Sequence, residues 1–145
     1  MRSMNQQEKE LIYNFIHRHE LAALATVDKT GKPEVAMVEF GDSPELEIIF
    51  DTLHPSYRKY ENIKNNNAVA LAIGWENNIT VQYEGRAIEI EGEEKDRCKK
   101  IYFTKNPIAE KWDSHPEIKY FKVMPKWIRY SDYSVKPYKI IELNF

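Results

Sequence analysis

Apolar residues recur at helical spacing in two segments of the chain, residues 5–19 and residues 93–104. In the first segment, Asn5 followed three positions later by Glu8 is typical of a capping box at a helix start. A third, shorter helix is predicted to begin at Pro55, because proline suits the first helical position, and to end at the asparagine run 65–67. The apolar positions that carry these patterns are Leu11, Ile12, Phe15, Ile16, Tyr60, Ile63, Cys98, Ile101 and Tyr102.

The remaining segments contain runs of Val, Ile, Ala and Thr separated by turn residues, which is typical of β-strands. Two such runs between Leu21 and Phe40 flank residues 28–31 and predict a hairpin. Gly85 indicates a bulge or a close approach of another backbone within a long strand. Six or seven short strands, mostly joined as hairpins, predict a mainly β (α+β) fold, an antiparallel barrel with peripheral helices. The further predicted strands cover residues 46–52, 68–75, 79–92, 120–134 and 138–145.

Length, composition and charge narrow the class of protein. With 145 residues, 42% of them hydrophobic, the chain fits a single domain over residues 1–145 with a real core. The net charge is −2, so the chain has no excess of basic residues of the kind that drives binding to the phosphate backbone of nucleic acids. The longest apolar runs are far shorter than the roughly 20 residues of a membrane span, and residues 1–11 lack the apolar core of a signal peptide. We therefore expect a cytoplasmic protein that binds neither nucleic acid nor membranes.

The usual catalytic and metal-binding patterns do not occur in the sequence. There is no G-x-S-x-G, P-loop or G-x-G-x-x-G pattern, so we assign no catalytic side chain. His17 and His19 would point to different sides of a helix, and we expect no metal site. Cys98 shares its helix side with Ile101 and Tyr102, which favours a core thiol over a nucleophile.

Residues 52–59 carry the strongest chemical signal. Thr52 and Ser56 offer hydroxyl groups, and Arg58 and Lys59 place two adjacent cations near a predicted helix start. A helix N-terminus already carries partial positive charge, so cations there are mildly unfavourable unless an anion joins them. No carboxylate lies between Thr52 and Tyr60, and a bound phosphate would supply the missing charge. The alternative is a pair of solvated cations on a helix surface.

Large aromatic residues gather late in the chain. We expect most of them in the core of the barrel or of a dimer, and a tryptophan that lines a planar ligand is the alternative. The late strands carry more large apolar surface than one core of this size should bury, which predicts a homodimer. The residues behind these two expectations are Trp112, Tyr120, Phe121, Trp127, Ile128, Tyr130 and Tyr133.

The order of these features resembles the pyridoxamine 5'-phosphate oxidase-like FMN-binding split barrels over most of the chain. "DKTGKPEVAMVEF" resembles the first hairpin of that family, and "IIFDT" the strand that lies along the flavin ring. "YRKYENIKNNNAVALAIGW" is similar to the family's R-K-x-x-x-[IL]-x-x-N-x-x-V-x-L run. "VQYEGRA" and "KKIYFTKNP" resemble the strand and the helix that follow.

The resemblance implies an antiparallel split β-barrel that binds FMN as a homodimer, with the flavin at the subunit interface. Arg58 and Lys59 would reach the phosphate, with hydroxyl groups from Thr52 and Ser56 as donors. The backbone of Phe50, Asp51 and Thr52 would face the flavin ring. Thr80 and Gln82 would offer polar side chains, and Trp112 or Trp127 would come from the partner subunit. The implied activity is that of an oxidoreductase or flavin reductase acting on a small molecule, because a flavin performs the redox step itself.

The sequence departs from the family pattern at the phosphate and substrate sites. Further cations of the family's second strand are replaced by Ala36 and Gly41, and Tyr57 separates Ser56 from the cation pair. The terminal R-x-H element that grips the vitamin substrate is absent, so we do not expect oxidation of vitamin B6. A flavin or haem carrier or sensor without turnover, and a dimeric barrel without a cofactor, are the alternative functions. The sequence identifies neither the substrate nor the electron donor.

Overall fold

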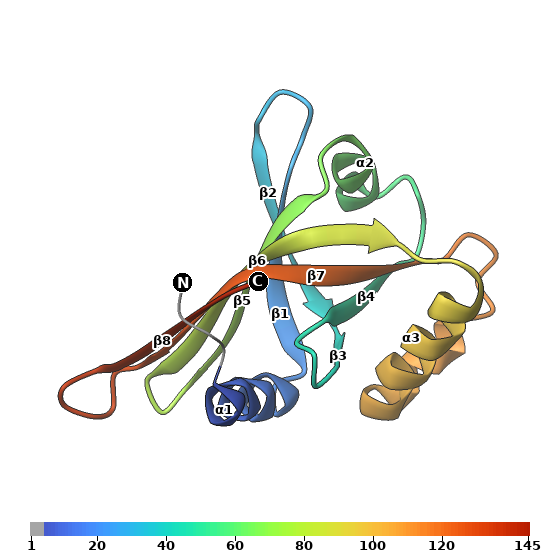
Figure 1. Ribbon diagram of the computed structural model, residues 1–145. Coiled ribbons are helices and arrows are strands. Elements are labelled where there is room, and N and C mark those ends of the chain that lie inside the picture. Colours follow the sequence, from blue (N-terminus) through green and yellow to red (C-terminus); the bar gives the residue numbers. More distant parts are fainter. Residues whose placement is uncertain (1–4) are drawn as a thin grey trace.

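The computed structural model describes residues 5–145 and is shown in Figure 1. Its helices are α1 (Gln6–His17), α2 (Arg58–Asn65), α3 (Gly92–Lys105) and the 3-10 helix η1 (Pro107–Trp112). Its strands are β1 (Leu21–Val27), β2 (Pro33–Glu39), β3 (Gly41–Asp42), β4 (Ile48–Thr52), β5 (Ala68–Glu76), β6 (Ile79–Glu89), β7 (Lys119–Asp132) and β8 (Lys139–Asn144). No described helix is long and apolar enough to cross a membrane.

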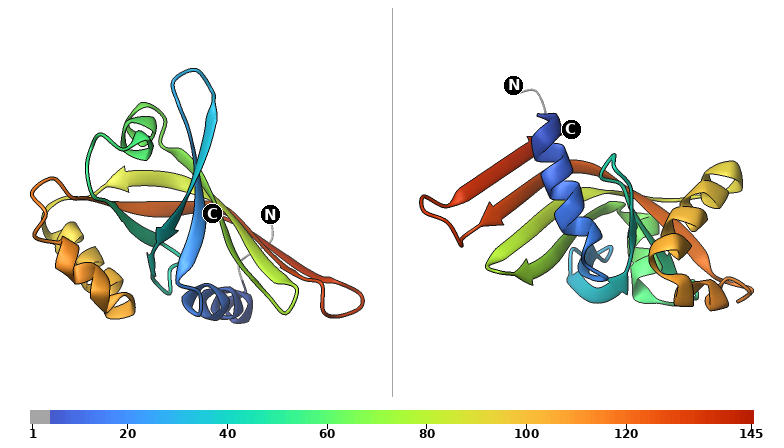
Figure 2. Two further views of the ribbon diagram at one scale, coloured as in Figure 1. Left: turned by 180° about the vertical axis from the view of Figure 1, so that it is seen from behind. Right: turned by 90° about the horizontal axis from the view of Figure 1, so that it is seen from below.

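The strands form one antiparallel sheet in the order β2-β1-β5-β6-β7-β4-β3. In addition, β8 pairs with the C-terminal part of β7. The two end strands, β2 and β3, are separated in sequence by Phe40 alone. Because the chain joins the two ends of the sheet directly, the sheet curls until its ends meet. This arrangement confirms the predicted antiparallel split β-barrel, with α1 and α3 on different sides of it (Figures 1 and 2).

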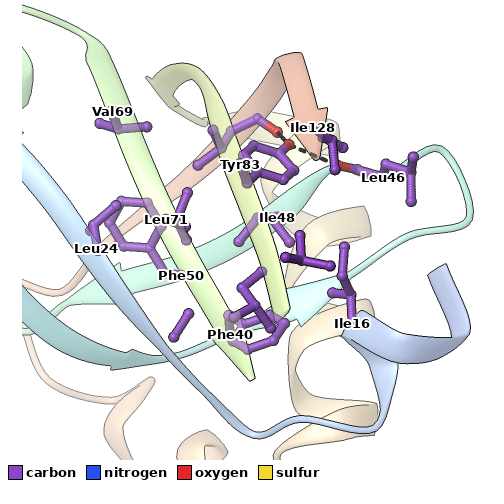
Figure 3. Packing of buried hydrophobic residues seen from close by; sticks show 14 of the residues in the cluster. Ile16, Leu24, Phe40, Leu46, Ile48, Phe50, Val69, Leu71, Tyr83 and Ile128 are labelled. Carbon is purple, nitrogen blue, oxygen red and sulfur yellow. Dashed lines mark hydrogen bonds between the residues drawn. The ribbon is translucent and has the colours of Figure 1, made fainter. Parts of the chain in front are cut away.

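The barrel core is built from alternate residues of the strands. Leu24 of β1 lies opposite Leu71 of β5, and both side chains are buried. Figure 3 shows these residues packed near Phe50 and Tyr83 inside the curled sheet. The Tyr83 hydroxyl donates to the carbonyl of Leu46 at 2.7 Å, so this large polar ring is buried without losing its hydrogen bond.

Two of the three predicted helices are confirmed near their predicted bounds. The Asn5 side chain caps α1 by accepting a hydrogen bond from the backbone N–H of Gln7 at 2.8 Å. The apolar stripe of α1 is buried against the barrel, as the spacing predicted. Helix α3 buries Cys98 and Tyr102 against β4 and β7. Burial raises the pKa of the Cys98 thiol to about 11, which confirms a core thiol.

The predicted start of the short helix is wrong by three residues, because α2 begins at Arg58 rather than at Pro55. The segment from His54 to Tyr57 forms a turn of its own. In this turn the backbone N–H of Tyr57 donates to the carbonyl of His54 at 3.1 Å, and that of Ser56 donates to His54 Nδ1 at 3.0 Å. Arg58 and Lys59 are therefore the first two residues of the helix.

Gly85 marks a close backbone approach, as predicted. The pairing of β6 with β7 shifts register between Glu84 and Gly85. A Cβ atom at Gly85 would lie 2.4 Å from the carbonyl oxygen of Met124, a distance that no side chain tolerates. Only glycine fits at this point of the sheet.

Candidate functional site

A cavity of about 240 Å³ lies where β2, β4, α2, α3 and η1 meet. We call it the β2–β4 cavity. It brings together three of the residues that the sequence suggested, Asp51, Lys59 and Trp112. Its full lining is Met37, Val38, Glu39, Asp51, Leu53, Lys59, Tyr102, Ala109 and Trp112.

The two adjacent cations of α2 have different surroundings. Lys59 lines the cavity. The Arg58 side chain is 78% exposed, and its Nε lies 3.2 Å from Oε2 of Glu34 on β2. Tyr57, the N-cap residue, makes no side-chain capping bond, so the first turn of α2 keeps backbone donors for a ligand. Glu34 is the carboxylate that sequence reasoning missed, because a pairing between β2 and α2 has no local signature.

The backbone of residues 50–52 forms a strand edge beside this cavity. β3 pairs only with Ile48 and Ile49 of β4, whereas β7 pairs with β4 through Thr52 on the other side. The side chains of Phe50 and Thr52 are buried, and Phe50 stacks on Phe121 with ring centroids 5.3 Å apart. The Thr52 hydroxyl donates to the carbonyl of His54 at 3.4 Å. The side chains of Phe50 and Thr52 therefore point into the protein, and Asp51 is the residue of this segment that lines the cavity.

Asp51 and Tyr102 form the polar centre of the cavity. The Tyr102 hydroxyl donates to Oδ2 of Asp51 at 3.0 Å. Burial raises the pKa of Asp51, although the Tyr102 hydrogen bond and the charge of Lys59 oppose the rise. Tyr102 was expected only as a core residue, since its helical spacing gives no sign that its hydroxyl end reaches a cavity.

Trp112 enters the cavity of its own chain. Trp112 lines this cavity within one chain, and the contribution of Trp112 or Trp127 from a partner subunit, which the resemblance implied, stays a prediction. The side chain of Asn106 fixes the start of η1 by donating to the carbonyl of Phe40 at 2.8 Å. Because Phe40 links β2 to β3, this bond holds the segment that carries Trp112 against the junction of the barrel.

The other predicted ligand residues lie apart from the β2–β4 cavity. Gln82 and Trp127 line a second cavity of about 240 Å³ on the outer face of the sheet, together with Val35. Thr80 borders neither cavity and pairs with Ser131 of β7. Ser56 is exposed in the turn before α2, where its hydroxyl contacts His54. Within one chain, the predicted ligand residues are therefore divided between the β2–β4 cavity, the turn before α2 and the outer face of the sheet.

The structure explains one of the two missing cations of the second strand, the one at Gly41. A Cβ atom at Gly41 would lie 2.9 Å from Cα of Tyr102, so the backbone of α3 occupies the space of any side chain. Ala36 lies directly opposite the buried Leu24 of β1 and shares its face of the sheet. Gly41 therefore cannot carry a side chain, whereas Ala36 is only partly buried.

The four histidines are engaged elsewhere. His17 pairs with Asp42 at 2.7 Å, and His19 lies 2.7 Å from the carbonyl of Phe15. His54 and His115 lie next to each other beyond the cavity, and none of the four lines it. Over residues 5–145, no group of three or more His, Cys, Asp or Glu side chains is placed to hold a metal ion.

Comparison with known proteins defines the class to which this fold and cavity belong. Residues 9–132 match the family model of pyridoxamine 5'-phosphate oxidase. The chain belongs to this family. It is 33% identical over 107 residues to the pyridoxine/pyridoxamine 5'-phosphate oxidase of Haemophilus influenzae, which covers 73% of this chain and 49% of that protein. The chain thus spans about half the length of the curated relative that it matches.

Solved structures share the fold at lower sequence identity. A haem-binding protein from Mycobacterium smegmatis superposes with a TM-score of 0.78 at 14% identity, covering 99% of this chain and 60% of that one. A putative pyridoxamine 5'-phosphate oxidase from Listeria innocua superposes with a TM-score of 0.72 at 19% identity, covering 88% and 99%. At such identities the comparison establishes the fold alone, and this fold occurs in proteins named for haem as well as for the oxidase.

Proposed function

We propose that this protein binds FMN in the β2–β4 cavity as a homodimer and acts as a flavin-dependent oxidoreductase or flavin reductase on a small molecule. One observation carries the proposal. Lys59, one of the two cations at the start of α2, lines the same cavity as Asp51, which belongs to the strand edge of residues 50–52. A phosphate at one end and a polar flat ring at the other are the two recognition demands of FMN.

The residues present fit the phosphate end of the cofactor. Lys59 lines the cavity, and Arg58 stands beside it on the helix. The first turn of α2 adds backbone N–H groups and the partial positive charge of a helix N-terminus. Charge-assisted hydrogen bonds from such groups to phosphate are about twice as strong as neutral ones. Ala36 and Gly41 stand where other family members have further cations, so we assign the phosphate to the two cations Arg58 and Lys59.

The residues also fit the ring end. Trp112 supplies an aromatic surface that is 47% exposed, and the backbone edge of β4 supplies hydrogen-bonding groups. Asp51 adds a carboxylate that accepts a hydrogen bond from Tyr102. A bound flavin would supply the redox step itself, by exchanging hydride with a substrate. The chain's own task would be to bind, orient and shield the ring, with the Asp51 carboxylate and the Tyr102 hydroxyl as the polar groups of the cavity.

A second subunit is part of the proposal because the cavity is incomplete in one chain. Its volume of about 240 Å³ is below the range of roughly 300 to 1,000 Å³ in which ligand pockets usually fall. Met37 borders the cavity and is 63% exposed, and Val35, two positions earlier on the same face of β2, is 67% exposed. A partner seated on this face would cover both side chains and close the cavity.

The homodimer is argued from a different surface than the sequence suggested. Ile128 and Tyr130 are buried inside their own chain, so they contribute no surface to a partner. The outer face of β1 and β5 instead presents Ala23, Ala25, Ala70 and Ala72, which line the second cavity. Small side chains let a partner backbone approach closely, so we place the interface on this outer face.

We propose a small-molecule substrate other than vitamin B6, because the sequence contains no R-x-H element. FMN is favoured over haem because no histidine lines the cavity, and histidine is a common axial ligand of haem.

Identification of the bound cofactor tests the proposal. The purified protein is heated, and the released small molecules are identified by mass spectrometry together with the absorbance spectrum before heating. We expect FMN and a flavin spectrum, or tight FMN binding when a cofactor-free preparation is titrated. Release of haem, or no binding of FMN at micromolar concentration, would contradict the proposal.

A further inference from the structure

Nδ1 of His54 contacts both hydrogen-bond donors of Ser56, the backbone N–H and the hydroxyl group. Ser56 lies two positions before the cation pair. The backbone N–H of Ser56 donates to His54 Nδ1 at 3.0 Å, and the Ser56 hydroxyl oxygen lies 2.9 Å from the same nitrogen. On the other side of the ring, His54 Nε2 is in close contact with Oε2 of Glu117, from the segment before β7. His54 has no motif around it, and sequence reasoning passed over it.

These contacts define which nitrogen of His54 carries the proton. A backbone N–H can only donate, so Nδ1 must accept and therefore carries no hydrogen. The ring is then neutral with its hydrogen on Nε2, which donates to Glu117. The Ser56 hydroxyl, with Nδ1 as its acceptor, points its single hydrogen at the ring. In this state neither donor of Ser56 is free for an anion.

We propose that His54 controls phosphate binding at this site, because protonation of Nδ1 releases both donors of Ser56 toward the FMN phosphate. This inference rests on the proposed FMN site. A protonated Nδ1 cannot accept a hydrogen bond, so the Ser56 backbone N–H and hydroxyl become available next to Arg58 and Lys59. The imidazolium also adds one positive charge beside the phosphate. His54 is thus a positioning residue, and FMN binding takes up a proton.

The charged groups around His54 are arranged for this change. Glu117 contacts Nε2 and is placed to pair with the imidazolium. His115 packs edge-on against His54 with ring centroids 6.5 Å apart. Its Nδ1 accepts the backbone N–H of Glu117 at 3.3 Å. Arg58 and Lys59, on the first turn of α2, oppose a further positive charge until a phosphate arrives. The phosphate therefore couples its own binding to protonation of the ring.

Proton uptake on binding tests this inference directly. The heat of binding of FMN, and separately of riboflavin, is measured at neutral pH in buffers of different ionisation enthalpy. The wild type, His54→Gln and His17→Gln are compared. His17→Gln is the matched control, because His17 pairs with Asp42 and has no contact with His54, Ser56 or Glu117 in the contacts above. We expect FMN binding to take up a larger fraction of a proton in the wild type and in His17→Gln than in His54→Gln. Riboflavin, which lacks the phosphate, should show no difference.

The pH profile of affinity provides a second readout. FMN affinity is measured between about pH 6 and 8, where histidine side chains titrate. The ratio of wild-type to His54→Gln affinity should rise as the pH falls, and this ratio cancels the titration of the phosphate itself. Equal proton uptake in both proteins together with a flat ratio would overturn the inference. If the wild type binds FMN no more tightly than riboflavin, the proposed function itself fails, which is a separate result.

A third variant keeps the test decisive if His54→Gln disturbs the fold. Glu117→Gln leaves the His54 ring and Ser56 in place and removes only the carboxylate that pairs with the imidazolium. We expect it to lower the proton uptake on FMN binding at neutral pH. Unchanged uptake in Glu117→Gln, in a protein that melts like the wild type, would also count against control by His54.

Discussion

The guanidinium Nε of Arg58 lies 3.2 Å from Oε2 of Glu34, whereas Lys59, the next residue, lines the β2–β4 cavity. The two adjacent cations are therefore not equivalent in the protein without a ligand. Arg58 already has a carboxylate partner on β2, and Lys59 faces the place proposed for the phosphate. Because Arg58 and Lys59 have different surroundings, each of them has its own prediction.

Replacement of Glu34 by Gln should strengthen FMN binding. The variant removes the charge that competes with phosphate for Arg58, while the amide keeps the shape of the side chain. Exposed ion pairs are worth up to about 1 kcal/mol, so we expect an affinity gain of up to about fivefold. Riboflavin binding should not change. A loss of FMN affinity in the Glu34→Gln titration would show that Glu34 supports the site instead of competing with it.

Asp51→Asn should make the cofactor-free protein more stable at neutral pH. Burial raises the pKa of Asp51 above its value in the unfolded chain, so the folded state disfavours the ionised carboxylate. The resulting penalty is present above the folded pKa and disappears as the pH falls below the usual carboxyl range near 4. The variant keeps an acceptor for the Tyr102 hydroxyl. Its gain in melting temperature should therefore shrink toward acidic pH.

Asp113 provides the matched control, since it also accepts a hydrogen bond from a tyrosine, Tyr120 at 2.8 Å. Burial acts to raise its pKa, but the bonds from Lys99 and Tyr120 outweigh burial and the pKa is lowered. Asp113→Asn should consequently lose stability at neutral pH, and the loss should vanish as the pH falls. If both variants changed melting temperature in the same direction, the account of Asp51 would be wrong.

Gly41→Ala should destabilise the fold by about 1 to 3 kcal/mol, the usual cost of overpacking. Its added Cβ would meet Cα of Tyr102 at 2.9 Å, and backbone cannot move aside as a flexible side chain does. Gly31→Ala is the control, because nothing lies within 4 Å of its Cβ and only its positive φ of 86° opposes alanine. Urea denaturation of both variants measures the difference. Equal costs would show that α3 can shift away from β3.

The barrel could be predicted from the sequence because its signals are local. Alternating apolar residues mark each strand, and Asn5 marks the start of α1 with its own side chain. The prediction of a helix start at Pro55 was wrong because the His54 ring accepts a hydrogen bond from the N–H of Ser56 and stabilises a turn there instead. That competition between a side chain and a helix leaves no trace in spacing or composition.

The candidate site was predictable only in part. Lys59 and Asp51 follow from the order of motifs, and the cavity contains both. Tyr102 and Glu34 were missed because they reach the site from α3 and β2, and contacts between distant segments have no periodic signature. The surface argument from Ile128 failed for a similar reason, since the sequence cannot tell which face of a strand its own barrel covers.

Met37→Asp should dissociate the proposed homodimer. Met37 is 63% exposed beside the cavity, and a charge there would lie inside the proposed interface. Ile108→Asp, at a side chain 75% exposed on η1, is the control that should leave the assembly unchanged. Light scattering at micromolar concentration checks both variants. A monomeric wild type, or a dimer that survives Met37→Asp, would contradict this placement of the interface.

The central claim is that Lys59 holds the phosphate of FMN, and titration of Lys59→Ala with FMN and with riboflavin tests it most directly. A charge-assisted hydrogen bond is worth about 1.5 to 3 kcal/mol, so FMN affinity should fall at least about tenfold. Riboflavin affinity should stay the same, and the double variant with Arg58→Ala should fall further. Lys64→Ala is the control on the same helix, where Lys64 pairs with Glu89 at 3.3 Å and does not line the cavity. Unchanged FMN affinity in Lys59→Ala, or an equal loss for FMN and riboflavin, would contradict the phosphate site.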